Sequence, residues 1–261
     1  VIAAQASLIA KWQGLGFIHG VMNTDNMLLC GETIDYGPCA FMETYDPATV
    51  FSSIDHQGRY AYGNQPGIAH WNLAQLAQAL IPLIDEDSDT ALSLAQASVN
   101  RFPQQFLDSY HDEFARKLGL AHCRGEADQQ LIADFLDLLK THRMDFTNSF
   151  RALTMQLRPP KAVSDDERMA AWLERWRQRC KAEADGIETL QARIRTSNAA
   201  VIPRNHLVQA AIEEAERDKR FSQFEELLAV CTQPYNDDEI DDKWTRPATA
   251  EQQVRQTFCG T

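Results

Sequence analysis

Beyond Pro66-Gly67 the apolar positions recur every three or four residues almost to position 230, which is the spacing of amphipathic helices. The stretch "HWNLAQLAQALIPLI" shows this period at Trp71, Leu73, Leu76, Leu80 and Leu83. The pattern predicts helices at 70–84, 88–101, 104–118, 126–141, 145–157, 165–182, 184–196, 204–217 and 220–230. The chain is therefore expected to be mainly α-helical. The proline-containing stretch "QLRPPKAVSDDE" at 156–167 is expected to break the helices into two blocks.

The pattern before Pro66 is more varied. Residues 2–13 predict a helix that Gly14 and Gly16 end, with an inward face made of Ile2, Leu8, Ile9 and Trp12. Residues 41–69 have the composition of a long loop, and loops of this length in compact domains usually have a function. At the other end of the chain, residues 232–261 predict an extended, acidic tail.

Short apolar runs at 27–36 flank Gly31-Glu32, which predicts a β-hairpin. Glycine in the first central position suits a two-residue type II′ turn. In this register Cys30 faces Thr33, Leu28 faces Asp35 and Asn26 faces Gly37. Asn26 and Asp35 then become diagonal neighbours on one face of the hairpin, about 7 Å apart at the backbone.

Composition and charge exclude several classes of partner. The chain has 261 residues, of which 44% are apolar and 24% charged, and a formal net charge of −12. An acidic chain repels phosphate backbones, so nucleic acid is not an expected partner. No apolar run approaches the roughly 20 residues of a membrane span. The six cysteines are scattered without a C-x-x-C pair, so neither a zinc site nor a disulfide framework is expected.

The oxygens of Asn26 and Asp35 are candidate ligands for one hard cation. One carboxylate, one amide oxygen and several water or phosphate oxygens form a typical Mg²⁺ site, and Mn²⁺ accepts similar ligands. Such a site is weak without a phosphorylated substrate, which is how many nucleotide-dependent transferases hold their metal. These two residues therefore predict a metal site that is completed by a nucleotide such as ATP.

The order of motifs around this pair resembles the catalytic segment of protein-kinase-like enzymes. A helix is followed by His19-Gly20, then by Asn26, and after the hairpin by the Asp-aromatic-Gly sequence that starts at Asp35. In those enzymes an acidic base follows the His-Gly or His-Arg pair, but here that position is Val21, which cannot accept a proton. A carboxylate appears four residues later as Asp25, directly before Asn26.

The motifs "HGVMNTDNM", "TIDYGP", "DHQGRY", "NQP", "RNHLVQAAIEEAE" and the terminal "CGT" resemble the selenoprotein O family of pseudokinase-fold adenylyltransferases. The resemblance covers essentially the whole chain. It implies transfer of AMP from ATP to Ser, Thr or Tyr hydroxyls of proteins. It also implies that Asp25 is the proton acceptor, that Asn26 and Asp35 bind Mg²⁺ or Mn²⁺, and that Asp35 lies near the nucleotide.

The resemblance implies a protein-kinase-like C-terminal lobe with a small β-hairpin, followed by extra C-terminal helices. Residues 1–157 are the expected lobe, with the catalytic segment at 19–37 and a loop at 38–69, and residues 158–261 are the expected helical extension and tail. No glycine-rich loop or strand lysine precedes His19, so the N-lobe is expected to be absent from this chain and the chain alone to be inactive. The expected location is the bacterial cytoplasm, or the mitochondrion in a eukaryote.

Two other functions remain open: an atypical kinase that transfers the γ-phosphate, and a non-catalytic pseudokinase scaffold or regulator. The alternative for Asp25 is that it is only a turn former or a helix cap, since "NTDN" is rich in turn residues. His19 is expected to be structural.

Several side chains outside the 19–37 segment have alternatives of their own. In the long loop, His56, Gln57, Arg59 and Tyr60 could contact phosphates, but an Arg59–carboxylate pair that fixes the loop is favoured. Trp172 and Trp176 are expected in the core. The resemblance also implies a redox role for Cys259, with Cys39 or Cys30 as partner; a free terminal thiol is the alternative.

Overall fold

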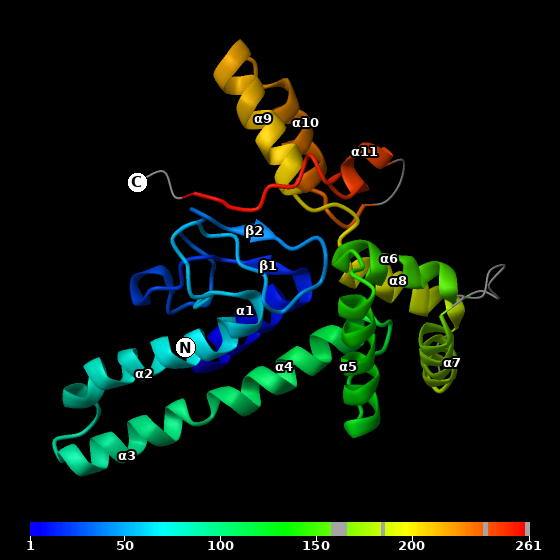
Figure 1. The fold of residues 1–261 in the computed structure, drawn as a ribbon. Helices are drawn as coiled ribbons and strands as arrows, with labels where there is room; N and C mark the ends of the chain where they lie inside the picture. Colours follow the sequence, from blue (N-terminus) through cyan, green and yellow to red (C-terminus); the bar gives the residue numbers. More distant parts are fainter. Residues whose placement is uncertain (158–165, 184–185, 237–239, 259–261) are drawn as a thin grey trace. The chain divides into compact units, whose positions relative to one another are not determined.

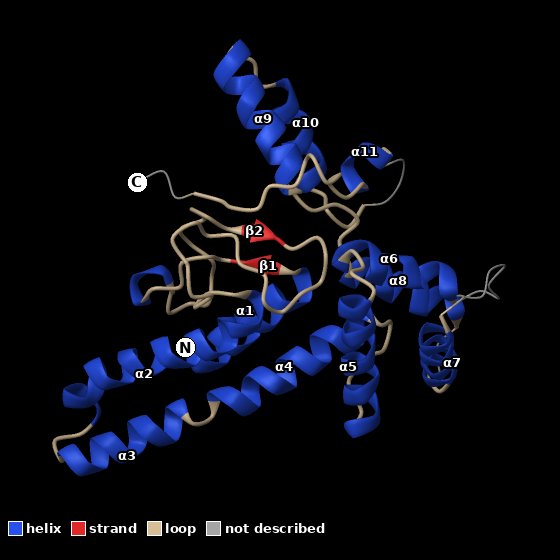
Figure 2. Ribbon diagram, viewed as in Figure 1, coloured by secondary structure: helices blue, strands red, loops and turns tan. Residues whose placement is uncertain are grey.

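The computed structural model describes residues 1–157, 166–183, 186–236 and 240–258. These residues are mainly helical, as the sequence predicts, and the two strands have only two residues each (Figure 2). Contacts within the chain form two compact units. The first contains Val1–Cys39, Pro47–Tyr110 and the described residues from Gln256 on, and the second contains Ala40–Asp46 and His111–Arg255. The predicted kinase-like lobe and its boundary at 157/158 stay predictions.

The first unit holds the segment with the candidate site. Its elements are α1 (Ile2–Leu15), β1 (Phe17–Ile18), the 3₁₀ turns η1 (Thr24–Asn26) and η2 (Tyr62–Asn64), α2 (Gln65–Ile84), α3 (Ser88–Val99) and the first part of α4 (Phe102–Lys117). Helices α2 and α3 pack side by side (Figure 1). Helix α2 begins five residues earlier than predicted, because proline is tolerated in the first turn of a helix and Pro66 lies there.

The second unit contains β2 (Ala40–Phe41), the end of α4 and the remaining helices. These are α5 (Glu126–Thr141), α6 (Phe146–Gln156), α7 (Glu167–Lys181), α8 (Ile187–Ser197), α9 (Asn205–Asp218), α10 (Ser222–Cys231) and α11 (Asp242–Thr245). Helices α5 to α10 match the predicted helices to within three residues at each end. Helix α6 ends at Gln156 and α7 begins at Glu167, and most of the predicted break at 156–167 lies outside the described residues. The prediction of a wholly extended tail was wrong, because Asp241 accepts a hydrogen bond from Lys243 N and caps the short helix α11.

Aromatic rings form the centre of the second unit. Trp172 and Trp176 are fully buried and stack with their centroids 5.9 Å apart, which confirms their predicted place in the core. Each indole N–H donates to a backbone carbonyl, Trp172 to Leu131 at 2.8 Å and Trp176 to Leu118 at 2.9 Å. Burial of these large rings is therefore not opposed by an unpaired donor.

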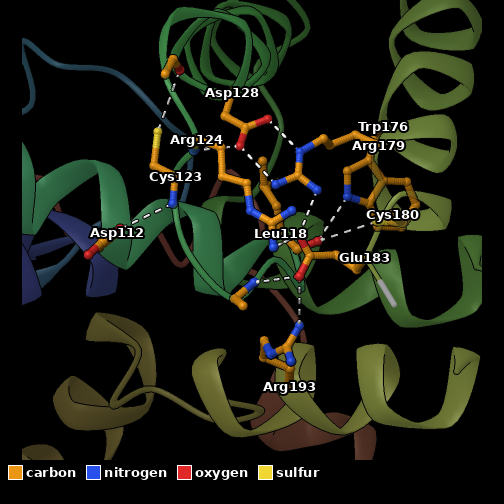
Figure 3. Close-up of polar contacts among 12 residues, drawn as sticks. Asp112, Leu118, Cys123, Arg124, Asp128, Trp176, Arg179, Cys180, Glu183 and Arg193 are labelled. Atoms are coloured by element: carbon orange, nitrogen blue, oxygen red, sulfur yellow. Dashed lines mark hydrogen bonds and ion pairs between the residues drawn. The ribbon is translucent and has the colours of Figure 1, made fainter. Parts of the chain in front are cut away.

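An ion-pair cluster joins α5, α7 and α8 beside this aromatic core (Figure 3). Arg179 donates two hydrogen bonds to Asp128, at 2.7 and 3.0 Å, and a third to Glu183 at 2.6 Å. Arg193 and Arg124 lie 3.9 and 3.3 Å from the Glu183 carboxylate. Burial is the largest single effect and raises the pKa of Glu183, but the hydrogen bond and charge of Arg179, together with Ala121 N–H and the Arg124 charge, outweigh it, so the pKa lies below its usual value.

Replacing Arg179 by methionine should lower the free energy of unfolding by about 3–5 kcal/mol, because the Asp128 side chain, only 3% exposed, would lose its cation. Glu183, only 2% exposed, would keep only the more distant Arg124 and Arg193. The matched control is Arg168→Met. Arg168 and Asp137 are also 2.6 Å apart, but their side chains are 61% and 58% exposed, so its loss should cost less than about 1 kcal/mol. Urea unfolding measures both, and equal losses would contradict the argument from burial.

A second prediction concerns Lys117, which is buried against the faces of Phe146 and Phe150 at 5.3 and 4.4 Å from their centroids. Burial lowers the pKa of Lys117 from 10.5 to about 7, and the Glu113 charge opposes this shift. Between these two pH values the unfolded chain binds the extra proton, so the free energy of unfolding contributed by this group rises from pH 7 to pH 10.5 and is lowest below pH 7.

Lys117→Met should therefore raise the free energy of unfolding at pH 6 by about 2–4 kcal/mol. It should also make the increase of that free energy between pH 7 and pH 10 smaller. Aromatic faces favour the charged form, so the gain should be smaller than the pKa difference alone implies. The control is the exposed Lys140, whose change to methionine should leave the curve almost unaltered. Urea unfolding between pH 6 and 10 checks this, and destabilisation at pH 6 would contradict it.

Candidate functional site

The candidate site lies on an irregular segment that leaves β1 at Ile18 and runs to Asp35. The predicted two-residue hairpin turn was wrong: Gly31 N donates to Leu28 O at 3.0 Å, and the isolated antiparallel bridge pairs Met27 with Thr33, so Cys30 does not face Thr33. Gly31 has φ 78°, and a Cβ there would lie 2.8 Å from the Cβ of Ala4 on α1. Packing against α1 therefore sets the register, which local turn preferences do not reveal.

Side chains of the flanking helices hold the backbone of this segment. Buried Gln65, at the start of α2, donates to Phe17 O at 2.9 Å and accepts from His19 N at 3.0 Å. Asn72, about two turns further into α2, donates to Met22 O at 3.0 Å. From α1, Gln5 donates to Leu28 O. An irregular buried backbone needs partners outside itself, and here neutral carboxamides supply them.

His19 is fully buried and links two parts of the segment. Its Nε2 lies 2.8 Å from Ile34 O and its Nδ1 3.4 Å from Val21 N. Nε2 must donate to the carbonyl, so Nδ1 is left to accept from the Val21 N–H, and this pattern suits the neutral imidazole. Burial lowers the pKa of His19, against the opposing effects of the Ile34 carbonyl and the Asp35 charge. These contacts agree with the structural role predicted for His19.

Asn26 has a fixed orientation at the end of η1. Its Nδ2 donates to Val21 O at 3.0 Å, and only the amide nitrogen can donate to a carbonyl. The Oδ1 atom is therefore directed away from this bond and is available to a cation. Because Val21 is also bonded to His19, the chain of contacts runs from Ile34, next to Asp35, through His19 to Asn26.

Asp25 and Asp35 are exposed carboxylates that adjoin the two ends of this chain of contacts, Asp25 before Asn26 and Asp35 after Ile34. Asp25 lies in η1, and no capping hydrogen bond from a side chain is found at the start of that turn. Asp35 has a left-handed φ of 54°, which is uncommon for a residue other than glycine. Among the described residues neither carboxylate has a hydrogen-bond or ion-pair partner.

Gly20 allows the segment to pass close to the chain beyond Asp35. It has φ 86°, and a Cβ at this position would lie 3.0 Å from Pro38. The Pro38 carbonyl accepts a hydrogen bond from the Thr257 hydroxyl, and Ser53 N donates to Thr257 O at 3.0 Å. Residues near the end of the tail therefore lie against the segment just beyond the candidate site.

The long loop after position 40 is ordered by its own polar contacts. Asp55 accepts from the backbone N–H groups of Arg59 and Tyr60, both at 2.8 Å, and the Tyr60 hydroxyl donates to Asn23 Oδ1 at 2.8 Å. The expected Arg59–carboxylate pair is not found among the described residues. Asp55 binds the backbone of Arg59 and not its guanidinium, which lies over the Trp71 ring.

The predicted redox partners are only partly described. Cys39 is half-buried, burial raises the pKa of its thiol to about 11, and Cys30 is exposed. Cys259 lies outside the described residues, so its pairing stays a prediction.

Sequence reasoning missed the residues that hold the segment, namely Gln5, Trp12, Gln65 and Asn72. Trp12 was assigned to the core, but its indole N–H also donates to Thr33 Oγ1 at 2.9 Å. The available signal was a polar residue in a helix position that the apolar period assigns to the inside. Gln5 and Asn72 are buried at such positions, whereas Gln65 lies before the predicted start of its helix and had no such signal.

The residues present suit one hard cation only as a partial ligand set. Within the described ranges, no three His, Cys, Asp or Glu side chains come together as a complete metal site would require. The oriented amide oxygen of Asn26 and the unpaired Asp35 carboxylate are oxygen ligands of the kind that Mg²⁺ binds when a nucleotide completes its shell. None of the described helices has the length and apolarity that a membrane crossing requires.

Comparison with known proteins identifies the class to which this fold and segment belong. Residues 1–232 match the model of a family described as protein adenylyltransferase SelO, and the chain therefore belongs to this family. It is 48% identical over its whole length to protein nucleotidyltransferase YdiU of Geobacillus kaustophilus and 49% identical to the protein of that name from Rhodopseudomonas palustris. In both cases the chain spans about half of the relative, 54% of its length.

The hydrogen bonds of Gln65 lead to a test of how the segment is held. Gln65→Leu should cost about 2–4 kcal/mol of stability, because the buried Phe17 carbonyl and His19 N–H would both lose their partner. Gln65→Glu, which can still accept from His19 N–H, is the matched comparison and should keep part of the protection of the backbone amides against hydrogen exchange. Amide hydrogen exchange at residues 17–24 measures the effect, and protection equal to that of the unaltered protein in Gln65→Leu would contradict it.

Proposed function

We propose that the full-length protein containing this chain transfers AMP from ATP to Ser, Thr or Tyr hydroxyls of proteins, with release of pyrophosphate. The observation that carries the proposal is the exposed, unpaired Asp25 carboxylate, held next to an Asn26 amide whose oxygen is free. Membership of a family described as adenylyltransferases and relatives named protein nucleotidyltransferases support it. Because the chain spans about half of those relatives, the activity is proposed for the whole protein and not for this chain alone.

In the proposed reaction the acceptor hydroxyl oxygen attacks the α-phosphorus of ATP. A new oxygen–phosphorus bond forms while the bond from the α-phosphorus to the bridging oxygen of the β-phosphate breaks, and pyrophosphate leaves with that electron pair. The hydroxyl proton passes to the Asp25 carboxylate, which acts as general base. No covalent enzyme intermediate is required.

Asn26 Oδ1 and the Asp35 carboxylate would hold the divalent cation. A bound Mg²⁺ or Mn²⁺ supplies charge neutralisation for the phosphates as pyrophosphate leaves. The fixed Asn26 amide reduces the reorganisation needed for binding, because its orientation is already set by the bond to Val21. His19 has no contact with a reacting group in this scheme. It holds the backbone on which Asn26 and Asp35 are placed.

The alternatives differ in the fate of the phosphates. An atypical kinase would transfer the γ-phosphate and release ADP, and a scaffold or regulator would transfer nothing. ATP labelled at the α-phosphate should label the acceptor protein only under the proposed reaction. ATP labelled at the γ-phosphate should label it only under the kinase alternative.

Asp25→Asn should lower α-label transfer by about 10²–10⁴-fold in the full-length protein, because the acceptor hydroxyl would lose its base. Asp35→Asn should raise the metal concentration needed for half-maximal rate. Glu32→Gln is the control, since Glu32 is another exposed acid of the same segment with no assigned role. Scintillation counting of the modified acceptor gives the rates, and full transfer by Asp25→Asn would overturn the proposal.

A further inference from the structure

Arg59 is held in a fixed place by contacts of its backbone. The Asp55 carboxylate accepts from the N–H groups of Arg59 and Tyr60, both at 2.8 Å, and Asn64 donates to Gly58 O at 2.7 Å. Gly58 takes φ 68°, a conformation open to glycine that closes this turn. The position of the Arg59 Cα is therefore set without any use of its guanidinium group.

The guanidinium rests on aromatic faces and leaves its hydrogen-bond donors open. It lies 5.0 Å from the Trp71 ring centroid and 5.7 Å from that of Tyr60. Among the described residues no carboxylate is within ion-pair distance of it, although Asp55 is only four residues away. Stacking on a ring orients the plane of a guanidinium while its edge N–H groups remain free for a planar, two-oxygen partner.

A hydrogen bond attaches this loop to the residue before the turn that carries Asp25. The Tyr60 hydroxyl donates to Asn23 Oδ1 at 2.8 Å, and Asn23 is the residue before η1, two positions from Asp25. In the proposed reaction the acceptor hydroxyl approaches Asp25, whereas the phosphates lie with the cation at Asn26 and Asp35. Arg59 is next to Tyr60 in this loop, and we therefore take its guanidinium as a group that an acceptor approaching Asp25 would meet.

The charge of the surrounding sequence makes Arg59 distinctive. It is the only Lys or Arg between Trp12 and Asn100, a stretch that contains ten Asp and Glu residues. An acidic group on an acceptor protein would be repelled by this stretch, except where it meets Arg59. With a single cation in an acidic neighbourhood, an anionic group of a partner has one favourable position, whereas a basic patch would offer several.

We propose that Arg59 binds the carboxylate of an Asp or Glu close to the modified hydroxyl of the acceptor protein, and so selects acceptors with an acidic residue at that position. The carboxylate would accept two parallel N–H bonds from the guanidinium fork, with Trp71 and Tyr60 covering the apolar face of the arginine. The inference rests on the proposed function, since it requires that acceptors be proteins.

The test uses the full-length protein with ATP and synthetic peptides that each contain one Tyr hydroxyl. In a matched series, Asp or Asn is placed at each position up to four residues on either side of that Tyr. At one or two positions, Asp should raise kcat/KM for the peptide by about three- to tenfold over Asn, in line with an exposed but bidentate ion pair. Arg59→Met should remove this preference, and Arg59→Lys should retain part of it.

Charge reversal distinguishes recognition from a structural role. Arg59→Glu should prefer Lys to Asp at the same peptide position, a result that damage to the fold could not produce. Arg101→Met is the control, because Arg101 is another exposed arginine of the first unit and should leave the Asp preference intact. Thermal unfolding of each variant verifies that the fold is retained.

Each other outcome overturns the inference in a recognisable way. If Asp is preferred at no position, or if Arg59→Met keeps the preference, Arg59 does not read an acceptor carboxylate. If Arg59→Met raises the KM for ATP equally with all peptides, the guanidinium binds nucleotide phosphates instead. If the unaltered enzyme transfers no α-label to any peptide or protein, or if Asp25→Asn is fully active, the proposed function fails first.

Discussion

A buried backbone without regular secondary structure must find hydrogen-bond partners among side chains, and this requirement shapes the first unit. Between Phe17 and Ile34 the chain forms one 3₁₀ turn and one bridge, so most of its peptide groups are not paired within a ladder or helix. Gln65, Asn72 and His19 supply partners for five of them. An unpaired buried peptide group costs about 1–3 kcal/mol, so these bonds decide whether the segment keeps one conformation.

The partners are uncharged, and this has an electrostatic consequence. A carboxamide or a neutral imidazole holds a peptide group without changing the local net charge, whereas an arginine would also attract Asp25 and Asp35. Both carboxylates therefore remain free while the backbone below them is fixed. In the proposed function a cation and a substrate would supply the partners that these two exposed acids lack among the described residues.

The sequence was sufficient to predict the helices, because their apolar period and end signals are local. Nine predicted helices after Gly67 are observed, and only the start of α2 was displaced by more than three residues. Periodicity did not show which faces are covered: Leu73 of α2 is buried, but Leu83, on the same spacing, is exposed. The hairpin register could not be predicted from local sequence either, because it depends on the approach of Gly31 to Ala4, a contact between residues 27 positions apart.

Motif residues separate into two kinds once their contacts are known. Arg204 belongs to the "RNHLVQAAIEEAE" motif, yet it is buried in the second unit and donates to Glu43 at 3.0 Å and Asp145 at 2.8 Å. The Arg204 charge is paired with carboxylates of the protein itself, and both ring nitrogens of His19 bond to the backbone. Asp25, Asp35 and Arg59 have no such side-chain partner among the described residues. The exposed charges of these three residues are left to solvent or to a ligand, and the proposed function assigns them to a ligand.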